Sequence, residues 1–213
     1  MKNVSGTMLF ETAPAIISYG SVVGRKEAQG PLRADFDRIV YDTYAGMSTF
    51  EQAESALVRE ATEEAMKKGK LRAGDIDIVF GGDLLNQCVA SSFAMRDFSI
   101  PYAGLYGACS TMALELIMGA IAVESGAVRT AACVASSHYC TAERQYRTPL
   151  EYGSQRTPTA QWTVTGAGAC ILSDTPSKDA YPRIHAAKLG VIIDMGVTDQ
   201  NNMGAAMAPA NVK

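Results

Sequence analysis

The sequence predicts an α/β protein with a largely parallel sheet, and three observations support this prediction. Short apolar segments of strand length alternate with longer helical segments along most of the chain. Several of the strand-like segments end in glycine, serine or aspartate, which are typical of the turns that follow buried strands. The helical segment 112–124 is apolar almost all the way round, so it must be buried on several sides. Strands that alternate with helices favour parallel pairing, because each helix carries the chain back to the start of the next strand.

The clearest single element is a helix predicted over 48–68. Ser48 and Glu51 form the capping-box pattern that begins a helix, and Gly69 is expected to end it. One face of this helix carries small and apolar residues at helical spacing, namely Ala53, Ala56, Leu57, Ala61 and Ala65. The helix is therefore expected to pack this face against the sheet.

The other elements follow in chain order. Strands are predicted over 15–23, 76–80, 102–106, 127–135 and 163–173, the start of another over 184–195, and a short helix over 84–93. The polar segment 140–162 lacks clear periodicity and is expected to form a long excursion, of a kind that often carries function. Trp162, at its end, is expected to pack in the core.

Composition excludes several classes of protein. The chain has 213 residues, 47% hydrophobic and 19% charged, which is an ordinary globular balance. Its net charge of −3 leaves no basic surplus for a nucleic-acid backbone, so no nucleic-acid partner is expected. No segment has the length and apolarity of a transmembrane helix or a signal peptide. The five cysteines include no Cys-x-x-Cys pair, so neither a zinc site nor a secreted disulfide framework is predicted.

A reactive thiol is one interpretation of the segment around Cys109. A strand, a Gly-Ala turn and then Cys-Ser-Thr open the helix 112–124. A thiol at a helix N-terminus lies at the positive end of the helix dipole, which favours the nucleophilic thiolate. The alternative, which the local sequence leaves equally open, is a small cysteine in a crowded turn.

Longer motifs carry a resemblance to known families. The segment GACSTMALELIMGAIAVESGAVRTAACVASS, which spans Gly107 to Ser137, resembles the active-site cysteine, buried helix and following strand of the thiolase-like superfamily. The strings AERQYR, EYG and AQWTVTGAGA, together with GGDLLNQ and DQNNMGAAMAPA, are more specific, and they resemble the stage V sporulation protein AD family. The resemblance implies a thiolase-like N-terminal half over 1–182, with a five-stranded, mostly parallel sheet and helices on both faces. Residues 183–213 would then be the first strand and connector of a second half that stops early.

The resemblance also implies a function. The family is linked to the uptake of dipicolinic acid into the developing spore, so this chain is expected to bind dipicolinic acid, or its calcium chelate, without catalysis. It would work with other stage V sporulation membrane proteins, as a peripheral protein on the cytoplasmic side of the spore inner membrane. No cofactor is expected, and calcium would enter only as an ion carried with dipicolinate. Without a second half, one apolar face of helix 112–124 would be exposed unless a homodimer or a separate fragment covers it, so self-association of the chain is expected.

Candidate ligand residues lie after the predicted strands, where open α/β sheets bind their ligands. They are Asp83, Asn86, Gln87, Cys109, Ser110 and His138, with Arg144 and Gln161 on the polar excursion. Helix N-termini and arginine would bind the carboxylates of dipicolinate, and an aromatic or arginine face would suit its ring. Two of these residues have structural alternatives: Asp83 could cap a helix, and His138 could bond a backbone carbonyl.

Two other functions remain open. The first is an acyl-transferring or condensing enzyme of the ketoacyl synthase type, with Cys109 as nucleophile. Such enzymes take their general-base residues from the second half of the fold, and the matching positions are absent from this sequence, which favours a protein that is not an enzyme. The second is a fragment that needs a partner half to fold.

Overall fold

A mixed sheet lies at the centre of the computed structural model, which describes all residues except 147–161, 175–180, 199–202 and 213. Within the described residues this sheet has six strands in the order β4-β3-β8-β7-β5-β6. They are β3 (Ala15–Gly24), β4 (Arg38–Val40), β5 (Ile78–Gly82), β6 (Tyr102–Gly104), β7 (Thr130–Ser137) and β8 (Gly166–Ser173). The α/β class predicted from the sequence is confirmed, although the described sheet has six strands instead of five.

The direction of β8 is the main departure from a parallel sheet. The pairs β3–β4, β5–β6 and β5–β7 are parallel, whereas β8 is antiparallel to both of its neighbours, β3 and β7. Strand β8 begins at Gly166, which pairs with Ser137 at the end of β7. It ends at Ser173, which pairs with Thr130 at the start of β7. The expectation of a mostly parallel sheet is therefore confirmed, with β8 as the one antiparallel strand of the described sheet.

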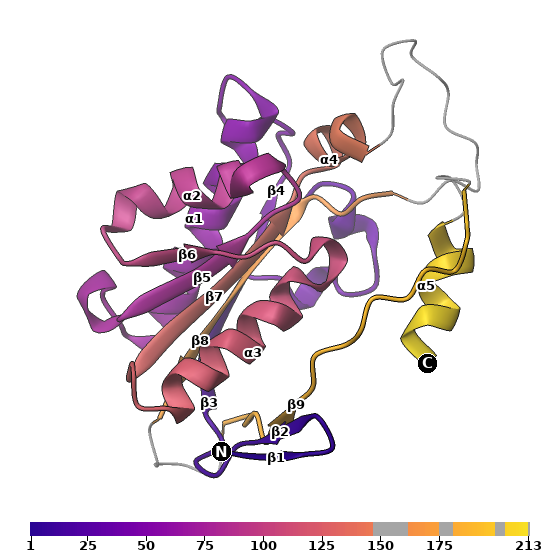
Figure 1. Cartoon of the computed structure of the whole chain (residues 1–213). Coiled ribbons are helices and arrows are strands. Elements are labelled where there is room, and N and C mark those ends of the chain that lie inside the picture. Colours follow the sequence, from indigo (N-terminus) through magenta and orange to yellow (C-terminus); the bar gives the residue numbers. More distant parts are fainter. Residues whose placement is uncertain (147–161, 175–180, 199–202, 213) are drawn as a thin grey trace.

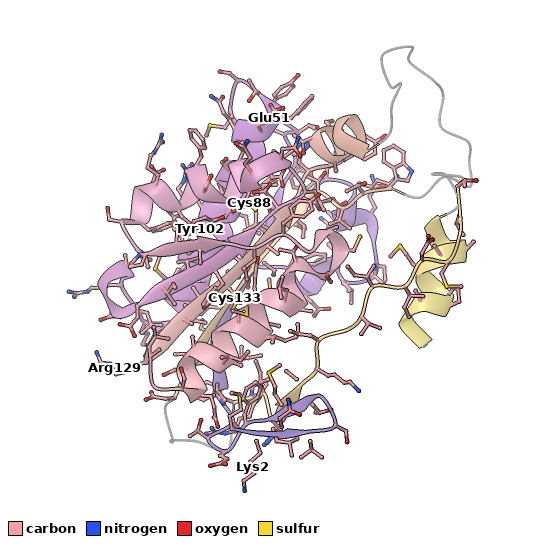
Figure 2. The ribbon with its side chains drawn as sticks, in the orientation of Figure 1. Lys2, Glu51, Cys88, Tyr102, Arg129 and Cys133 are labelled. Carbon is pink, nitrogen blue, oxygen red and sulfur yellow. The ribbon has the colours of Figure 1, made fainter. Side chains whose placement is uncertain are left out.

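Helices cover both faces of the sheet (Figure 1). Helices α1 (Phe50–Gly69) and α2 (Val89–Met95) pack on one face, and α3 (Thr111–Glu124) packs on the other. Alternate residues of β7 divide between the two cores: Ala132 lies in the cluster under α1, whereas Cys133 lies under α3 (Figure 2). This alternation is the period of two that a strand imposes when both of its faces are buried.

Helix α1 forms where the sequence predicts it, but its two ends differ from the prediction. The N-cap is Thr49 and not Ser48: the Thr49 hydroxyl accepts a hydrogen bond from the Gln52 amide at 3.2 Å. The left-handed residue at the other end is Lys70, while Gly69 is the last helical residue. A Cβ on Gly69 would lie 3.1 Å from the Ser18 side chain, so this glycine allows α1 to approach β3 closely.

The buried face of α1 is confirmed residue by residue. Its five predicted core residues are all at most 2% exposed. The contact with the sheet is close: a Cβ on Gly20 of β3 would lie 2.2 Å from the Ala61 carbonyl oxygen of the helix. A glycine is therefore required at position 20 for the helix to lie on the strand at this distance.

A small antiparallel sheet packs on the outer side of α3. It joins β1 (Lys2–Val4) and β2 (Thr7–Leu9) to β9 (Ala186–Ala187), so segments from the two ends of the sequence meet there. Phe10 and Ala187 pack with Ala120 of α3 in a separate apolar cluster. The carboxylate of Glu124 accepts hydrogen bonds from the backbone amides that follow β2, which fixes this sheet to the end of α3. Helix α3 is thus contacted on two sides, by the central sheet and by this small sheet, but most of its apolar side chains are only partly buried.

The segment after Pro182 contains less strand and more helix than predicted. Only β9 forms within 184–195, and Val191 and Ile192 are exposed because no strand among the described residues pairs with them. The segment expected to be a connector contains α5 (Met203–Val212). The remaining regular elements are α4 (Tyr139–Tyr146) and the short 3₁₀ turns 27–29, 33–35, 73–75, 86–88, 96–98 and 108–110. Among the described helices, none combines the length and apolarity needed to cross a bilayer.

Replacing Thr49 by alanine should destabilise the chain by about 1 kcal/mol, because the Gln52 amide at the start of α1 loses its acceptor. Ser48→Ala is the matched control, since Ser48 contributes only its backbone amide, which donates to the Gln52 side chain. Urea denaturation of the two variants measures the difference. An equal loss in both would contradict Thr49 as the N-cap.

Candidate ligand-binding site

The carboxyl ends of β5, β6 and β7 meet at one edge of the sheet, as the sequence predicts. Because these strands are parallel, the residues after Gly82, Gly104 and Ser137 lie at the same edge. Asp83 follows β5, and His138 follows β7 directly. The structure therefore places most of the predicted site residues around one end of the sheet.

Cys109 is exposed at the start of α3. It belongs to the 3₁₀ turn Ala108–Ser110, whose first residue is left-handed with φ of 47°. Thr111 holds this turn, since its hydroxyl accepts from the Gly107 amide at 3.1 Å and donates to the Ala108 carbonyl at 2.8 Å. Ser110 is also exposed, and its hydroxyl donates to the Gly107 carbonyl at 2.7 Å. The turn thus presents the Cys109 thiol to solvent at a helix N-terminus.

Asp83 is buried, and both of its carboxylate oxygens accept hydrogen bonds. One accepts from the Leu85 amide at 2.8 Å, and the other accepts from the amide and the hydroxyl of Ser91 at 2.8 and 2.7 Å. The Ser91 hydroxyl is in turn hydrogen-bonded to the Tyr102 hydroxyl, which also donates to the Gly81 carbonyl. This network ties α2 to β5 and β6, near Cys88 (Figure 2). The geometry favours a structural role for Asp83, and its contact with a ligand stays a prediction.

Asn86 and Gln87 are exposed on the 3₁₀ turn that precedes α2. Gln87 and Cys88 are both left-handed, with φ of 64° and 51°. Residues with a Cβ rarely adopt this conformation, and two in succession are a local strain of the kind that clusters at functional sites. The Cys88 thiol donates to the Leu105 carbonyl at 3.4 Å and helps to hold the turn.

His138 is fully buried, and both ring nitrogens have partners. Nε2 donates to the Thr43 carbonyl at 2.9 Å, and Nδ1 accepts from the Cys140 amide at 3.2 Å. Burial lowers the pKa of this imidazole, so it stays neutral at pH 7. The structure thus favours the carbonyl-bonding alternative. Of the last two predicted residues, Arg144 lies in α4 without a described side chain, and Gln161 lies outside the described residues.

Two buried carboxyl groups near this edge were not predicted from the sequence. Glu54 of α1 accepts from the hydroxyls of Ser136 and Thr141 at 2.9 and 2.8 Å, and burial raises its pKa to about 7. Glu115 of α3 is fully buried, and neither oxygen has a hydrogen-bond partner among the described residues. Burial raises its pKa to about 9, so Glu115 is a neutral acid at pH 7. A glutamate inside an apolar helix was the only signal for Glu115 in the sequence.

A cavity of about 300 Å³ lies beside this edge, on the side of α1. Residues from 24–29, 40–45 and 162–165 line it, together with Leu57 and Tyr139. The prediction that Trp162 packs in the core is wrong: the side chain is 47% exposed and borders this cavity. Its ring makes two contacts: Tyr139 stacks on it with 4.5 Å between the ring centres, and the Lys26 ammonium lies 3.7 Å from its ring centre.

No group of three or more histidine, cysteine, aspartate or glutamate side chains in the described ranges is arranged to hold a metal ion. The acidic side chains near the sheet edge instead lie in separate environments. Asp83 and Glu54 are each hydrogen-bonded to protein donors, and Glu115 is a neutral acid at pH 7.

Solved structures with the same fold define the class of this protein. The chain resembles a variant of OleA from Xanthomonas campestris bound with cerulenin, with a TM-score of 0.55 at 15% identity over 83% of this chain and 61% of OleA. It also resembles 3-oxoacyl-[acyl-carrier-protein] synthase III of Aquifex aeolicus VF5, with a TM-score of 0.52 at 13% identity over 78% of this chain and 55% of the synthase. The chain therefore has a thiolase-like fold.

Sequence comparison identifies the family within that class. The model of the family "Stage V sporulation protein AD (SpoVAD)" matches residues 4–213. A curated relative, stage V sporulation protein AD of Bacillus subtilis (strain 168), is 40% identical over 204 residues. The chain belongs to the stage V sporulation protein AD family. The match covers 96% of this chain and 60% of the length of the Bacillus relative.

The raised pKa values of Glu54 and Glu115 predict that the free energy of unfolding falls as pH rises. An exposed glutamate has a pKa of 4.5, so the unfolded chain loses both protons near that pH. The folded chain keeps the proton of Glu54 up to about pH 7 and that of Glu115 up to about pH 9, so the free energy of unfolding falls as pH rises through these two windows. In Glu54→Gln, the loss of unfolding free energy between pH 4.5 and 7 should be smaller by on the order of 3 kcal/mol. In Glu115→Gln, the decrease of unfolding free energy with pH should be weaker over the whole range up to pH 9.

Urea denaturation at half-unit steps from pH 5 to pH 9 measures this slope. Glu64→Gln is the control, because this carboxylate pairs with Lys67 at the surface and should leave the slope unchanged. Wild-type stability that rises with pH over this range would contradict the protonated state of both groups.

Proposed function

We propose that this chain binds dipicolinic acid, or its calcium chelate, without changing it chemically, and supports its uptake into the developing spore. The observation that carries the proposal is membership of the stage V sporulation protein AD family, which the family model and the Bacillus relative establish. The proposal includes work with other stage V sporulation membrane proteins, as a peripheral protein at the cytoplasmic side of the spore inner membrane.

The chemistry around Cys109 supports binding without catalysis. Condensing enzymes need a general base within reach of the reacting carbon. In the described part of the chain, neither His138 nor His185 forms a hydrogen bond with Cys109, and His138 is buried with both nitrogens engaged. The N-terminus of α3, beside the exposed Cys109 thiol, still provides backbone N–H groups and the positive end of the helix dipole for a carboxylate.

Dipicolinate should bind to the folded chain with micromolar or weaker affinity. Isothermal titration calorimetry, with and without calcium, measures this affinity after near-UV circular dichroism has confirmed folding. Isophthalate, which has the same two carboxylates but no ring nitrogen, is the control ligand and should bind more weakly. A folded sample that gives no heat above dilution would contradict the proposal.

A second function, acyl transfer through Cys109, is favoured by the exposed thiol on a ketosynthase-like fold. It predicts that an acyl-CoA leaves its acyl group on the Cys109 sulfur as a thioester and releases free CoA. Intact-mass spectrometry would detect the added acyl mass, and Cys109→Ser would show whether the label lies on this residue. We expect no adduct on the wild-type chain, and a stable adduct absent from the serine variant would support the enzyme instead.

A further inference from the structure

Three elements of the fold meet at one buried carboxyl group, that of Glu54 in α1. Its Oε1 lies 2.9 Å from the Ser136 hydroxyl near the end of β7, and its Oε2 lies 2.8 Å from the Thr141 hydroxyl in the first turn of α4. Glu54 is fully buried and forms no ion pair with any residue that the structure describes. The contacts of this one side chain therefore join α4 to α1 and to the sheet.

The hydrogens available in this cluster fit a protonated Glu54. The Thr141 hydroxyl has one hydrogen but two acceptors within reach, Glu54 Oε2 at 2.8 Å and the His138 carbonyl at 3.0 Å. If Oε2 carries a proton, Glu54 donates it to the Thr141 oxygen, and the Thr141 hydrogen goes to the His138 carbonyl. If Glu54 is ionised, these two acceptors compete for one hydrogen, and a negative charge is buried without a cation.

Helix α4 is the partner that can move away from this carboxyl. Ser136 belongs to β7, which is paired on both sides, whereas α4 has eight residues and lies at the end of that strand (Figure 1). Besides Thr141, the described contacts of its first turn are those of Tyr139, whose amide donates to the Thr165 hydroxyl and whose ring stacks on Trp162. Displacement of this turn is therefore the smallest change that brings water to an ionised Glu54.

We propose that the proton on Glu54 is a latch for α4: the first turn of the helix stays on α1 while Glu54 is protonated and leaves it when the proton is lost. Because Tyr139 in this turn lines the cavity beside α1 and stacks on Trp162, opening of the latch also removes an aromatic wall from that cavity. The latch goes beyond the proposed binding of dipicolinic acid and does not depend on it.

The latch works in the acid to neutral range. Burial, together with the nearby Asp83 carboxylate, raises the pKa of Glu54 to about 7, whereas an exposed glutamate has a pKa of 4.5. The open form thus loses the proton near pH 4.5 and the closed form near pH 7. The equilibrium constant for opening should therefore rise about tenfold per pH unit between these values and become constant above pH 7.

Other titratable groups near the latch are separable from Glu54. Burial lowers the pKa of His138, whose Nδ1 accepts from the Cys140 amide, so protonation of this ring would also loosen the turn, but on the acid side. Tyr139 and Cys140 of α4 are of types that ordinarily titrate above about pH 8. Glu51, one turn before Glu54, is partly exposed. Within the described part of the chain, the sides of β3, β8 and α2 that face α1 carry no titratable group.

Hydrogen exchange of the full chain, read by mass spectrometry from pH 5 to pH 8 and corrected for intrinsic rates, measures opening of α4. The variant Glu54→Gln keeps both hydrogen bonds, since its amide donates to Thr141 and accepts from Ser136, but it cannot ionise. The protection of the Tyr139–Tyr146 amides in the wild type, divided by that in Glu54→Gln, should fall about tenfold between pH 5.5 and 6.5 and level off above pH 7. His138 acts equally in both chains, so this ratio isolates Glu54.

Two further variants test the origin of the change. Glu64→Gln, which removes an exposed carboxylate from the same helix, should show the pH dependence of the wild type. Ser136→Ala removes a hydroxyl that favours the ionised form of Glu54, so its pKa should rise, and protection of α4 should level off at a higher pH than in the wild type. Ser136→Ala also provides the test if Glu54→Gln does not fold.

The outcomes are distinct from those of the binding experiments. A protection ratio that is constant with pH overturns the latch, and so does an equal loss of protection at every pH in Ser136→Ala, which would indicate a purely structural contact. The amides of β3 should stay protected throughout; if they lose protection together with α4, the whole chain unfolds and the latch is overturned. A chain that binds no dipicolinate but shows the predicted ratio would contradict the proposed function and support the latch.

Discussion

Strand β8 runs antiparallel to both of its neighbours, so its first residue lies beside the last residues of β3 and β7. Gly166 pairs with Val23 on one side and with Ser137 on the other. Three chain segments are thereby brought to one place: the residues that follow β3, those that follow β7 and those that precede β8. These segments contribute Lys26, Tyr139 and Trp162, so the direction of one central strand builds the aromatic and cationic walls of the cavity.

Local patterns in the sequence predicted the parts of this fold that depend on local physics. The periodicity of 48–68 identified both the helix and its buried face, because a helix must turn its apolar residues toward the sheet. The strand ends that carry Asp83, Cys109 and His138 were also placed at one edge correctly. The direction of β8 was not predicted, since the same alternation of residues suits a parallel or an antiparallel strand.

The side-chain environment at the site could not be read from the sequence for a similar reason. Tryptophan usually packs in cores, and only the meeting of three distant segments leaves Trp162 at the rim of a cavity. His138 and Asp83 carry functional chemistry by residue type, yet tertiary contacts engage their polar atoms. The protonation of Glu54 and Glu115 likewise depends on burial, which is a property of the folded chain.

The lengths of the strands have a consequence for how this chain meets other chains. Its long strands, β3, β7 and β8, are hydrogen-bonded on both sides, whereas the outermost strands of the described sheet, β4 and β6, have three residues each. An unpaired strand edge is a template on which another chain can add a strand. With only a few free amides and carbonyls at each border, this sheet offers little to such edge-to-edge addition, and the arrangement protects the chain against aggregation.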